Sequence, residues 1–374
     1  MVEKLDQTNR ILSQLKISKF TQSFPWIGGD LQTLRDSFSF DSPKLNNSEV
    51  IHVRIPGTPN GDFKAGSLLS LLSYPKANRP KRGLVVLLHG LGGSSERLGL
   101  KRMAKTLLKA DFAVLRVNLR GAPPGRNLVG GTYSAECSSD VIPVLIEARK
   151  LCLSFENDKI NNSKKFPLFG VGISLGGTIL LNSCFSEIKN NKFNHALLDG
   201  LVCTSSPLDL DACSKSIDRK RNLIYQKWLL NRLIKQTIAD PFNDFEFSKH
   251  IFLRKSTGKV EFPNSIRDFD DLITAPRWCY KSVDEYYELA SPLKKLLRGF
   301  DDRFPKTLIL QSEDDPWVPA ESAKDLFSRL TLSELSKINI VITKKGGHNG
   351  FHSKTGCWGD LLVKNWLCDL ACRI

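Results

Sequence analysis

The stretch Val171-Gly-Ile-Ser-Leu-Gly-Gly-Thr178 joins an apolar run to a segment of small and apolar residues. The run from Phe166 to Ile173 is typical of a buried strand, and Leu175 to Ser186 is typical of a helix with a small-residue face. Ser174 stands at the join, with a glycine two residues away on either side. Glycine relieves the backbone crowding of a sharp strand-to-helix turn. The stretch therefore predicts an exposed hydroxyl at the end of a strand, although a glycine-rich turn with a capping serine has the same pattern.

The composition is that of a globular protein with a sizeable core. The 374 residues include 41% hydrophobic ones, which suits two average domains or one large α/β domain with an insertion. We see no apolar signal segment at the start and no stretch long enough to cross a bilayer, so we expect a cytoplasmic protein. The nine cysteines are scattered without a CxxC pair, which favours reduced structural thiols and predicts no metal site.

The net charge of +15 raises the question of an anionic partner. The basic residues are dispersed in short clusters such as Arg219-Lys-Arg221 and Lys344-Lys345, with no aromatic-basic module. This pattern favours a solvated basic surface over nucleic-acid binding. Weak peripheral association with an anionic membrane surface is a secondary expectation.

Strand-length and helix-length segments alternate from residue 49 onward. Strands are expected over 48–55, 63–74, 83–88, 112–119, 166–173, 198–205, 307–311 and 338–345, and helices over 96–110, 139–155, 175–186, 320–330 and 358–371. This order predicts an α/β fold with a mostly parallel central sheet and helices on both faces. We divide the chain into an N-terminal extension that packs on the core (1–48), the core itself (49–206 and 305–374) and a helical cap or lid insertion (207–304).

A nucleophilic serine needs a base, and the chain has six histidines: 52, 89, 195, 250, 348 and 352. In this fold the partners follow in the order serine, acid, histidine. His52 and His89 precede the serine, His195 lies in a polar connection, and His250 lies inside the insertion. His348 follows the last expected strand directly, where paired glycines allow a short loop over the sheet. We therefore expect His348 to be the base and His352 to be solvated.

The acid is expected at the end of the preceding strand, where Glu313, Asp314 and Asp315 stand in a row. A carboxylate that accepts the imidazole N–H fixes the tautomer and stabilises the imidazolium. Asp315 stands four residues before a proline, a spacing common at this turn, and is our choice. Asp314 remains the alternative acid.

The oxyanion hole is expected in the glycine-rich loop His89-Gly-Leu-Gly-Gly-Ser-Ser95. Backbone N–H groups must face the cavity there, and glycines allow the close approach. The expected donors are the amides of Leu91 and Leu175, the second at a helix N-terminus. His89 is expected to be a structural residue of the loop.

With these motifs in place, the chain resembles the YheT-like branch of the α/β-hydrolases, described as carboxylesterases. The resemblance runs from about Pro25 to Ala371. Its more specific motifs are Pro25-Trp-Ile-Gly-Gly-Asp-Leu-Gln-Thr-Leu34, Asn118-Leu-Arg-Gly121, Arg267-Asp-Phe-Asp-Asp-Leu-Ile-Thr-Ala-Pro276, Tyr286-Tyr-Glu-Leu-Ala-Ser291 and Gly346-Gly-His-Asn-Gly-Phe351. The resemblance implies an α/β-hydrolase fold, a triad of Ser174, His348 and one of Asp314 and Asp315, and no cofactor. Asp30 replaces the usual histidine and Glu136 the usual glycine, and both departures bear on the substrate pocket.

Together these features predict a serine hydrolase that cleaves carboxylic esters through an acyl-enzyme. The apolar and aromatic residues of the insertion favour short- to medium-chain acyl esters or acylglycerols as substrates. An alcohol acyltransferase with the same triad is the nearest alternative. A non-catalytic binding protein on the same fold is another, and the intact triad speaks against it.

Overall fold

The computed structural model describes residues 7–38, 43–45, 48–75, 82–157, 165–190, 196–243, 252, 258 and 260–374. Eight strands of these residues form one sheet in the order β1-β2-β4-β3-β5-β6-β7-β8. The strands are β1 (Glu49–Ile55), β2 (Gly66–Ser73), β3 (Leu84–Leu88), β4 (Ala113–Val117), β5 (Leu168–Ile173), β6 (Gly200–Thr204), β7 (Lys306–Ser312) and β8 (Ile338–Thr343). The pairs β1–β2 and β2–β4 are antiparallel, and the other neighbours pair in parallel.

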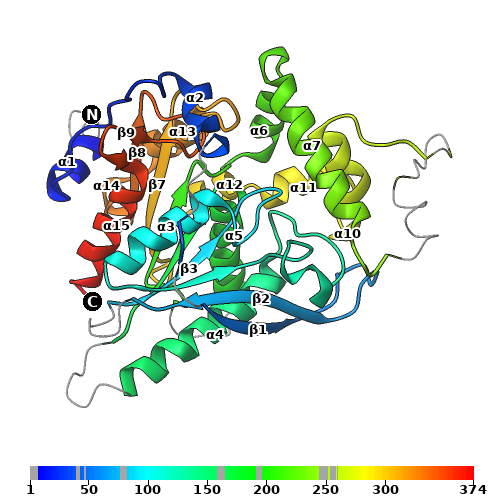
Figure 1. Ribbon diagram of the computed structural model, residues 1–374, viewed down its shortest axis with the longest axis horizontal. Coiled ribbons are helices and arrows are strands. Elements are labelled where there is room, and N and C mark those ends of the chain that lie inside the picture. The colour runs from blue at the N-terminus through cyan, green and yellow to red at the C-terminus, as the bar shows by residue number, and fades with distance from the viewer. Residues whose placement is uncertain are drawn as a thin grey trace.

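Helices cover both faces of this sheet (Figure 1). The α-helices of the described residues, including those between β6 and β7, are α1 (Gln7–Gln14), α2 (Gly29–Leu34), α3 (Leu98–Lys109), α4 (Ser138–Asn157), α5 (Leu175–Asn190), α6 (Leu210–Ile217), α7 (Leu223–Ile238), α9 (Ile266–Phe269), α10 (Ala275–Arg277), α11 (Val283–Ala290), α12 (Pro292–Leu297), α13 (Glu321–Arg329), α14 (Leu332–Lys337) and α15 (Trp358–Ala371). A separate short hairpin pairs β9 (His352–Ser353) with β10 (Gly356–Cys357).

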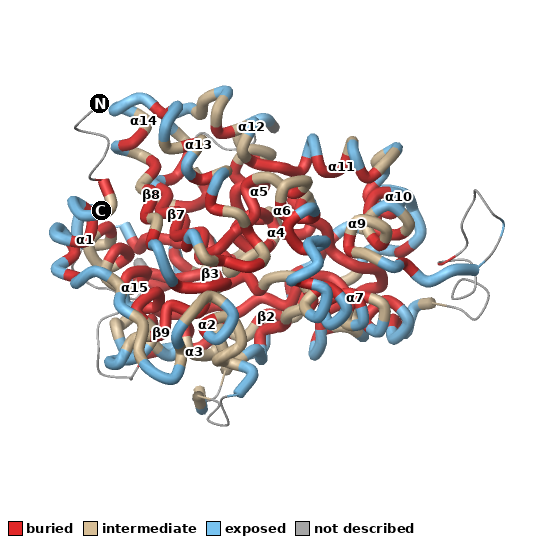
Figure 2. Tube along the Cα trace, turned by 90° about the horizontal axis from the view of Figure 1, so that it is seen from above, coloured by how far each residue is buried: buried red, intermediate tan, exposed pale blue. Residues whose placement is uncertain are grey.

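The central strands are buried on both faces, as the continuous apolar runs predict. Along β3, Leu84, Val86 and Leu88 pack into one core cluster with α4 and α5. Val85 and Leu87 alternate with them and pack into a second cluster with α1, α3 and α15. Figure 2 shows the sheet as a continuous buried layer with exposed segments outside it. The expected α/β class is therefore confirmed.

The N-terminal segment contacts the edge of the sheet at β8. The Gln7 side chain accepts a hydrogen bond from the backbone N–H of Ile340 at 3.1 Å and donates to the carbonyl of Leu335 at 3.3 Å. The first bond partners a backbone group that the edge strand leaves open, and the second joins the segment to α14. The division of the chain at residue 48 stays a prediction.

The chain between β6 and β7 is largely helical and carries α6, α7 and α9 to α12. In Figure 1, α6 and α7 lie on the same side of the sheet as α2. A small core of their own, with Ile217, Leu229, Leu233 and Phe269 among its members, holds several of these helices together. The boundaries 207–304 that we assign to this cap stay a prediction.

The observed elements are mostly shorter than the expected ones. The strand expected over 63–74 begins only at Gly66, because Thr58 accepts from and donates to the backbone of Phe63 and closes a turn there. Helix α14 was not expected. Its first turn is set by a capping box in which Thr331 and Glu334 bond each other's backbone N–H groups.

Candidate active site

Ser174 lies at a sharp turn between β5 and α5, and its backbone is left-handed with φ of 55°. A Cβ atom on Gly172 would lie 2.2 Å from the backbone nitrogen of Gly177. A Cβ atom on Gly176 would lie 2.5 Å from the carbonyl oxygen of Leu88. Side chains at these two positions would collide with backbone, so only glycine permits this turn. The turn is the strand–serine–helix elbow that the sequence predicts.

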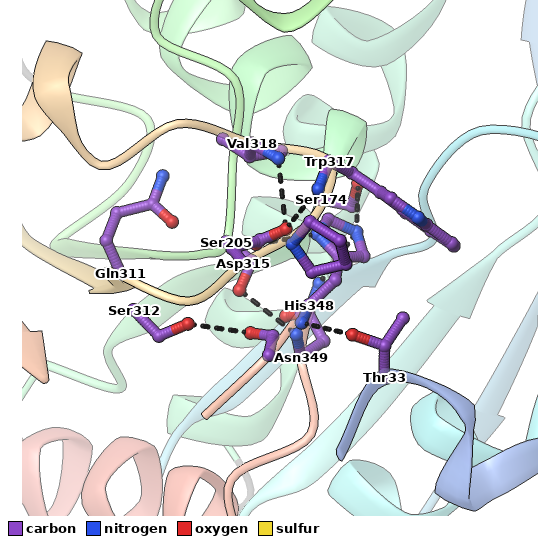
Figure 3. A network of polar contacts seen from close by, with 12 residues as sticks. Thr33, Ser174, Ser205, Gln311, Ser312, Asp315, Trp317, Val318, His348 and Asn349 are labelled. Atoms are coloured by element: carbon purple, nitrogen blue, oxygen red, sulfur yellow. Dashed lines mark hydrogen bonds and ion pairs between the residues drawn. The ribbon is translucent and has the colours of Figure 1, made fainter. Parts of the chain in front are cut away.

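A chain of hydrogen bonds joins Ser174 to His348 and Asp315 (Figure 3). The Ser174 Oγ lies 2.9 Å from the His348 Nε2. The His348 Nδ1 lies 2.9 Å from the Asp315 Oδ2. With Nδ1–H donating to this carboxylate, Nε2 is left to accept the serine hydroxyl proton. The structure thus brings together three residues that are far apart in the sequence.

Asp315 is held in place by its second oxygen. Its Oδ1 accepts the backbone N–H groups of Trp317 at 2.8 Å and Val318 at 3.0 Å. The side chain of Asp315 is fully buried, and that of His348 is 6% exposed. A carboxylate with fixed orientation in this buried position fixes the tautomer and the orientation of the imidazole. The Trp317 ring packs on the imidazole with a centroid distance of 4.4 Å.

The neighbouring carboxylate, Asp314, contacts the loop instead of the ring. Its Oδ1 accepts the backbone N–H of Gly347 at 2.9 Å and the hydroxyl of Ser312 at 3.2 Å. Thr33 of α2 accepts the backbone N–H of His348 at 2.8 Å. The histidine loop is therefore held from two sides, and one of these contacts comes from the N-terminal segment.

The glycine-rich loop after β3 lies against the serine. A Cβ atom on Gly90 would lie 2.8 Å from the Ser174 Cβ. Leu91 and Leu175 both line the cavity at the serine, and Leu175 is the first residue of α5. That the amides of Leu91 and Leu175 donate to an oxyanion stays a prediction.

His89 is a buried residue of the same loop. Its Nε2 accepts the backbone N–H of Leu119 at 3.2 Å, so its Nδ1 donates to the carbonyl of Gly90 at 2.9 Å. Burial lowers the pKa of His89 to about 4. Both ring nitrogens are engaged, which agrees with the structural role expected for this residue.

A cavity of about 330 Å³ opens beside the serine, between the sheet edge and the helices that follow β6. Ser174 and His348 contribute to its wall. Much of the rest is apolar and comes from the cap, with Leu210, Ile217, Trp228, Leu229, Leu233, Ile266 and Phe269. Within the described ranges, no group of three or more His, Cys, Asp and Glu side chains is arranged to hold a metal ion.

The expectation that His352 is solvated is wrong. The side chain is 4% exposed, and its Nε2 lies 3.2 Å from the Asp36 Oδ1. Desolvation lowers the pKa of His352, and the Asp36 carboxylate opposes that effect. The sequence did not indicate this burial, because Asp36 is far from His352 in the chain. Arg102, which donates to the Asp36 carboxylate, is also far from both residues in the chain. His52 is exposed on β1, and His195 and His250 lie outside the described residues.

The two departures from the family pattern both form ion pairs. Asp30 accepts from Arg221 at 2.9 Å and from the Tyr225 hydroxyl at 3.1 Å. Glu136 accepts from Lys295 at 2.8 Å. Asp30 thus connects α2 to the start of α7, a contact that the sequence did not indicate.

Residues 85–355 match the family model described as the alpha/beta hydrolase family. Together with the observed sheet and the serine at its elbow, this match defines the class: an α/β-fold protein with a hydrolase-type site. The chain belongs to the alpha/beta hydrolase family.

Individual relatives refine this placement. The chain is similar to the putative esterase YheT of Escherichia coli (strain K12), with 27% identity over 83% of this chain and 82% of that protein, which confirms the expected resemblance. It is also similar to the phospholipase ABHD3 of Bos taurus, with 25% identity over 72% of this chain and 58% of that one. A solved structure of a soluble variant of monoglyceride lipase from Saccharomyces cerevisiae shares the fold with a TM-score of 0.53, 15% identity and coverage of 89% and 98%.

We predict an acid-dependent loss of stability that originates at His89. Its folded pKa of about 4 lies below the ordinary value of 6.5, so between these pH values the unfolded chain binds the proton that the folded chain does not. Stability therefore falls as the pH drops through this window, by up to about 3 kcal/mol from this group. Urea unfolding from pH 7 to pH 4 measures it.

The matched comparison is His89→Asn against His52→Asn. The first variant should lose this part of the pH dependence, and the second, on the exposed face of β1, should keep the wild-type slope. Identical slopes in all three proteins would contradict the assignment.

Proposed function

We propose that the protein is a serine hydrolase that cleaves carboxylic esters, with Ser174 as nucleophile, His348 as general base and Asp315 as the orienting acid. The observation that carries the proposal is the pair of 2.9 Å contacts from the serine to the imidazole and from the imidazole to the carboxylate. This arrangement is the geometric requirement for an activated serine.

The proposed reaction uses each group in turn. The Ser174 Oγ attacks the ester carbonyl while His348 Nε2 takes its proton, and the tetrahedral oxyanion accepts the backbone N–H groups of Leu91 and Leu175. The imidazolium, stabilised by Asp315, gives its proton to the departing alcohol. Water then attacks the acyl-enzyme with His348 again acting as base, and the acid and the free serine are released. Every step uses groups that lie at the cavity wall or directly behind it.

The relatives and the cavity support a class of substrate. Relatives named esterase, phospholipase and monoacylglycerol lipase support a carboxylic ester or acyl lipid substrate here. The wall from the cap is apolar. A volume of 330 Å³ is near the lower end of the roughly 300–1,000 Å³ range of ligand pockets. These two features favour acyl chains of short to medium length, in simple esters or acylglycerols.

The alternative is an acyltransferase, in which an alcohol instead of water attacks the same acyl-enzyme. Saccharomyces cerevisiae has a relative named medium-chain fatty acid ethyl ester synthase/esterase 2. Product analysis with ethanol or glycerol in the reaction separates the two activities. Turnover that depends on Ser174 would exclude a purely binding function.

We predict that Asp315→Asn lowers kcat by about 10⁴-fold on p-nitrophenyl butyrate, because the amide cannot stabilise the imidazolium and favours the wrong tautomer. Asp314→Asn is the matched control. Its remaining oxygen can still accept the Gly347 N–H, so kcat should stay within about tenfold of wild type. A larger loss from Asp314→Asn than from Asp315→Asn would contradict the assignment of the acid.

We further propose that the protein associates weakly with anionic membrane surfaces through the two segments that border the cavity. None of the described helices has the length and apolar character needed to span a bilayer. Thr33, Asp36 and Ser37 line the cavity from the N-terminal segment, and Trp228 and Leu229 line it from α7. We call the exposed faces of residues 24–38 and 219–228 the rim.

The rim combines exposed apolar side chains with cations. Phe24 is 85% exposed and Ile224 is 83% exposed. The exposed apolar residues of the rim are Phe24, Ile27, Leu31, Phe38, Leu223, Ile224 and Trp228, and the exposed basic ones on its α7 side are Arg219, Lys220, Arg221 and Lys227. Asp30 ties its two halves together through Arg221 and Tyr225. Such a surface can insert apolar groups among lipid headgroups while its cations contact anionic ones.

The prediction is that Phe24→Ser combined with Ile224→Ser lowers the partition coefficient onto vesicles containing phosphatidylglycerol by at least about tenfold, because each side chain adds roughly 1.5–3 kcal/mol when buried. Vesicle sedimentation measures it, and added salt should weaken wild-type binding. Leu332→Ser, at an exposed apolar position on α14, is the control and should bind as wild type does. Equal binding by the double variant and the wild type would contradict the proposal that the rim contacts the membrane.

A further inference from the structure

Asp270 is a carboxylate in the wall of the catalytic cavity. It begins a π-helical turn, Asp270–Thr274, in the cap, and such turns are often found at functional sites. The Thr274 hydroxyl donates to its Oδ1 at 2.7 Å, and the Tyr287 hydroxyl donates to its Oδ2 at 2.8 Å. Burial raises the pKa of Asp270 to about 6, against the opposing effect of these hydrogen bonds. At neutral pH the cavity therefore has a negative charge in its wall.

No cation of the described residues forms an ion pair with this carboxylate. The nearby guanidinium of Arg267 pairs with Asp211 and Asp284 and lies over the Tyr287 ring. A charge withdrawn from water without an ion partner requires hydrogen-bond donors. A carboxylate offers about four lone-pair sites, and the Thr274 and Tyr287 hydroxyls use one on each oxygen. Each oxygen of Asp270 can accept one further donor.

Two other polar side chains of the same cavity wall have a donor without an acceptor among the described residues. The Gln236 side chain is 8% exposed, and its Nε2 is buried without a hydrogen-bond acceptor. The Tyr286 oxygen accepts the backbone N–H of Ala135 at 2.8 Å, and no acceptor for its own proton is recorded among the described residues. Unsatisfied buried donors of this kind cost roughly 1–3 kcal/mol each. Both groups line the cavity beside Ser174, where hydroxyl oxygens of a bound ligand can accept from them.

We propose that Asp270, with Gln236 and Tyr286, forms a subsite for two neighbouring hydroxyl groups of the substrate, such as the free diol of a monoacylglycerol. The inference rests on the proposed ester hydrolysis and specifies its substrate class. Adjacent hydroxyls can donate to the two oxygens of Asp270 together, as a planar fork of donors does. The hydroxyl oxygens in turn accept from the Gln236 amide and the Tyr286 phenol. The rest of the cavity, which is largely apolar, takes the hydrocarbon part.

Binding of ether analogues tests the subsite without any hydrolysis. The protein is the Ser174→Ala variant, and the probes are 1-O-octylglycerol, with a diol, and 3-octyloxypropan-1-ol, with one hydroxyl. We expect the diol to bind at least tenfold more tightly, and Asp270→Asn in the same background to reduce that ratio to about one. Asp284→Asn, which removes an exposed carboxylate of the same cap, is the control and should keep the ratio.

Two further probes locate the diol and test its chemistry. 8-Propoxyoctane-1,2-diol carries the diol at the end of the chain, and tighter binding of this ether than of octylglycerol would place the subsite at the acyl end instead of the alcohol end. Either preference supports a diol subsite. Tighter binding of 3-octyloxypropylamine than of both diols would overturn it in favour of an ammonium site.

A purely structural role of Asp270 gives a different result. In that case Asp270→Asn would weaken all ethers by the same factor and lower the melting temperature, with no change in the diol ratio, and the inference would be overturned. Kinetics supply the second readout: the ratio of kcat/KM for glyceryl monooctanoate over propyl octanoate should fall at least tenfold in Asp270→Asn. If the diol ratio holds in the ether assay but no ester is cleaved, the subsite stands and the proposed hydrolysis fails.

Discussion

The site depends on one backbone constraint, the left-handed turn that carries Ser174 from β5 into α5. The turn can form only because Gly172 and Gly176 leave no Cβ atom to meet the backbone of α5 and β3. It places the hydroxyl at the carboxyl end of the sheet, where the loops after β3, β7 and β8 begin. His348 and the glycine-rich loop both reach Ser174 at this one edge, and Asp315 contacts His348 from behind. Without the turn, the Ser174 hydroxyl would not lie where His348 and the glycine-rich loop meet.

The remaining parts of the site are held by contacts between distant segments. Asp314 and Thr33 both accept backbone N–H groups of the histidine loop, so the N-terminal segment takes part in positioning His348. Asp30 then joins that segment to Arg221, just before α7, and to Tyr225 of α7. The cavity beside Ser174 is thus bounded by three parts of the chain, and its shape depends on the fold as a whole. Asp30, which departs from the family pattern, therefore provides a hydrogen-bond acceptor where α2 meets the start of α7.

The sequence predicted the regular parts of the molecule well, because they follow from local rules. Alternating strands and helices and the glycine pair around Ser174 each depend on residues close in the chain. The burial of His352 was missed because its partner Asp36 is far away in sequence and contacts it only in the folded protein. The same reason hides the wall formed by Asp270, Tyr286 and Gln236: each residue alone looks like an ordinary polar residue of an amphipathic helix. The amides expected at Leu91 and Leu175 are still predictions, because only a bound oxyanion tests them.

The central claim is that the imidazole of His348 activates the oxygen of Ser174. The most direct measurement is the mass and position of the adduct formed with a fluorophosphonate, followed by peptide mapping of wild type and His348→Ala. We predict a single adduct on the peptide that contains Ser174, formed at least about a hundredfold more slowly when the imidazole is removed. An adduct on another residue, or equal rates in the two proteins, would contradict the account.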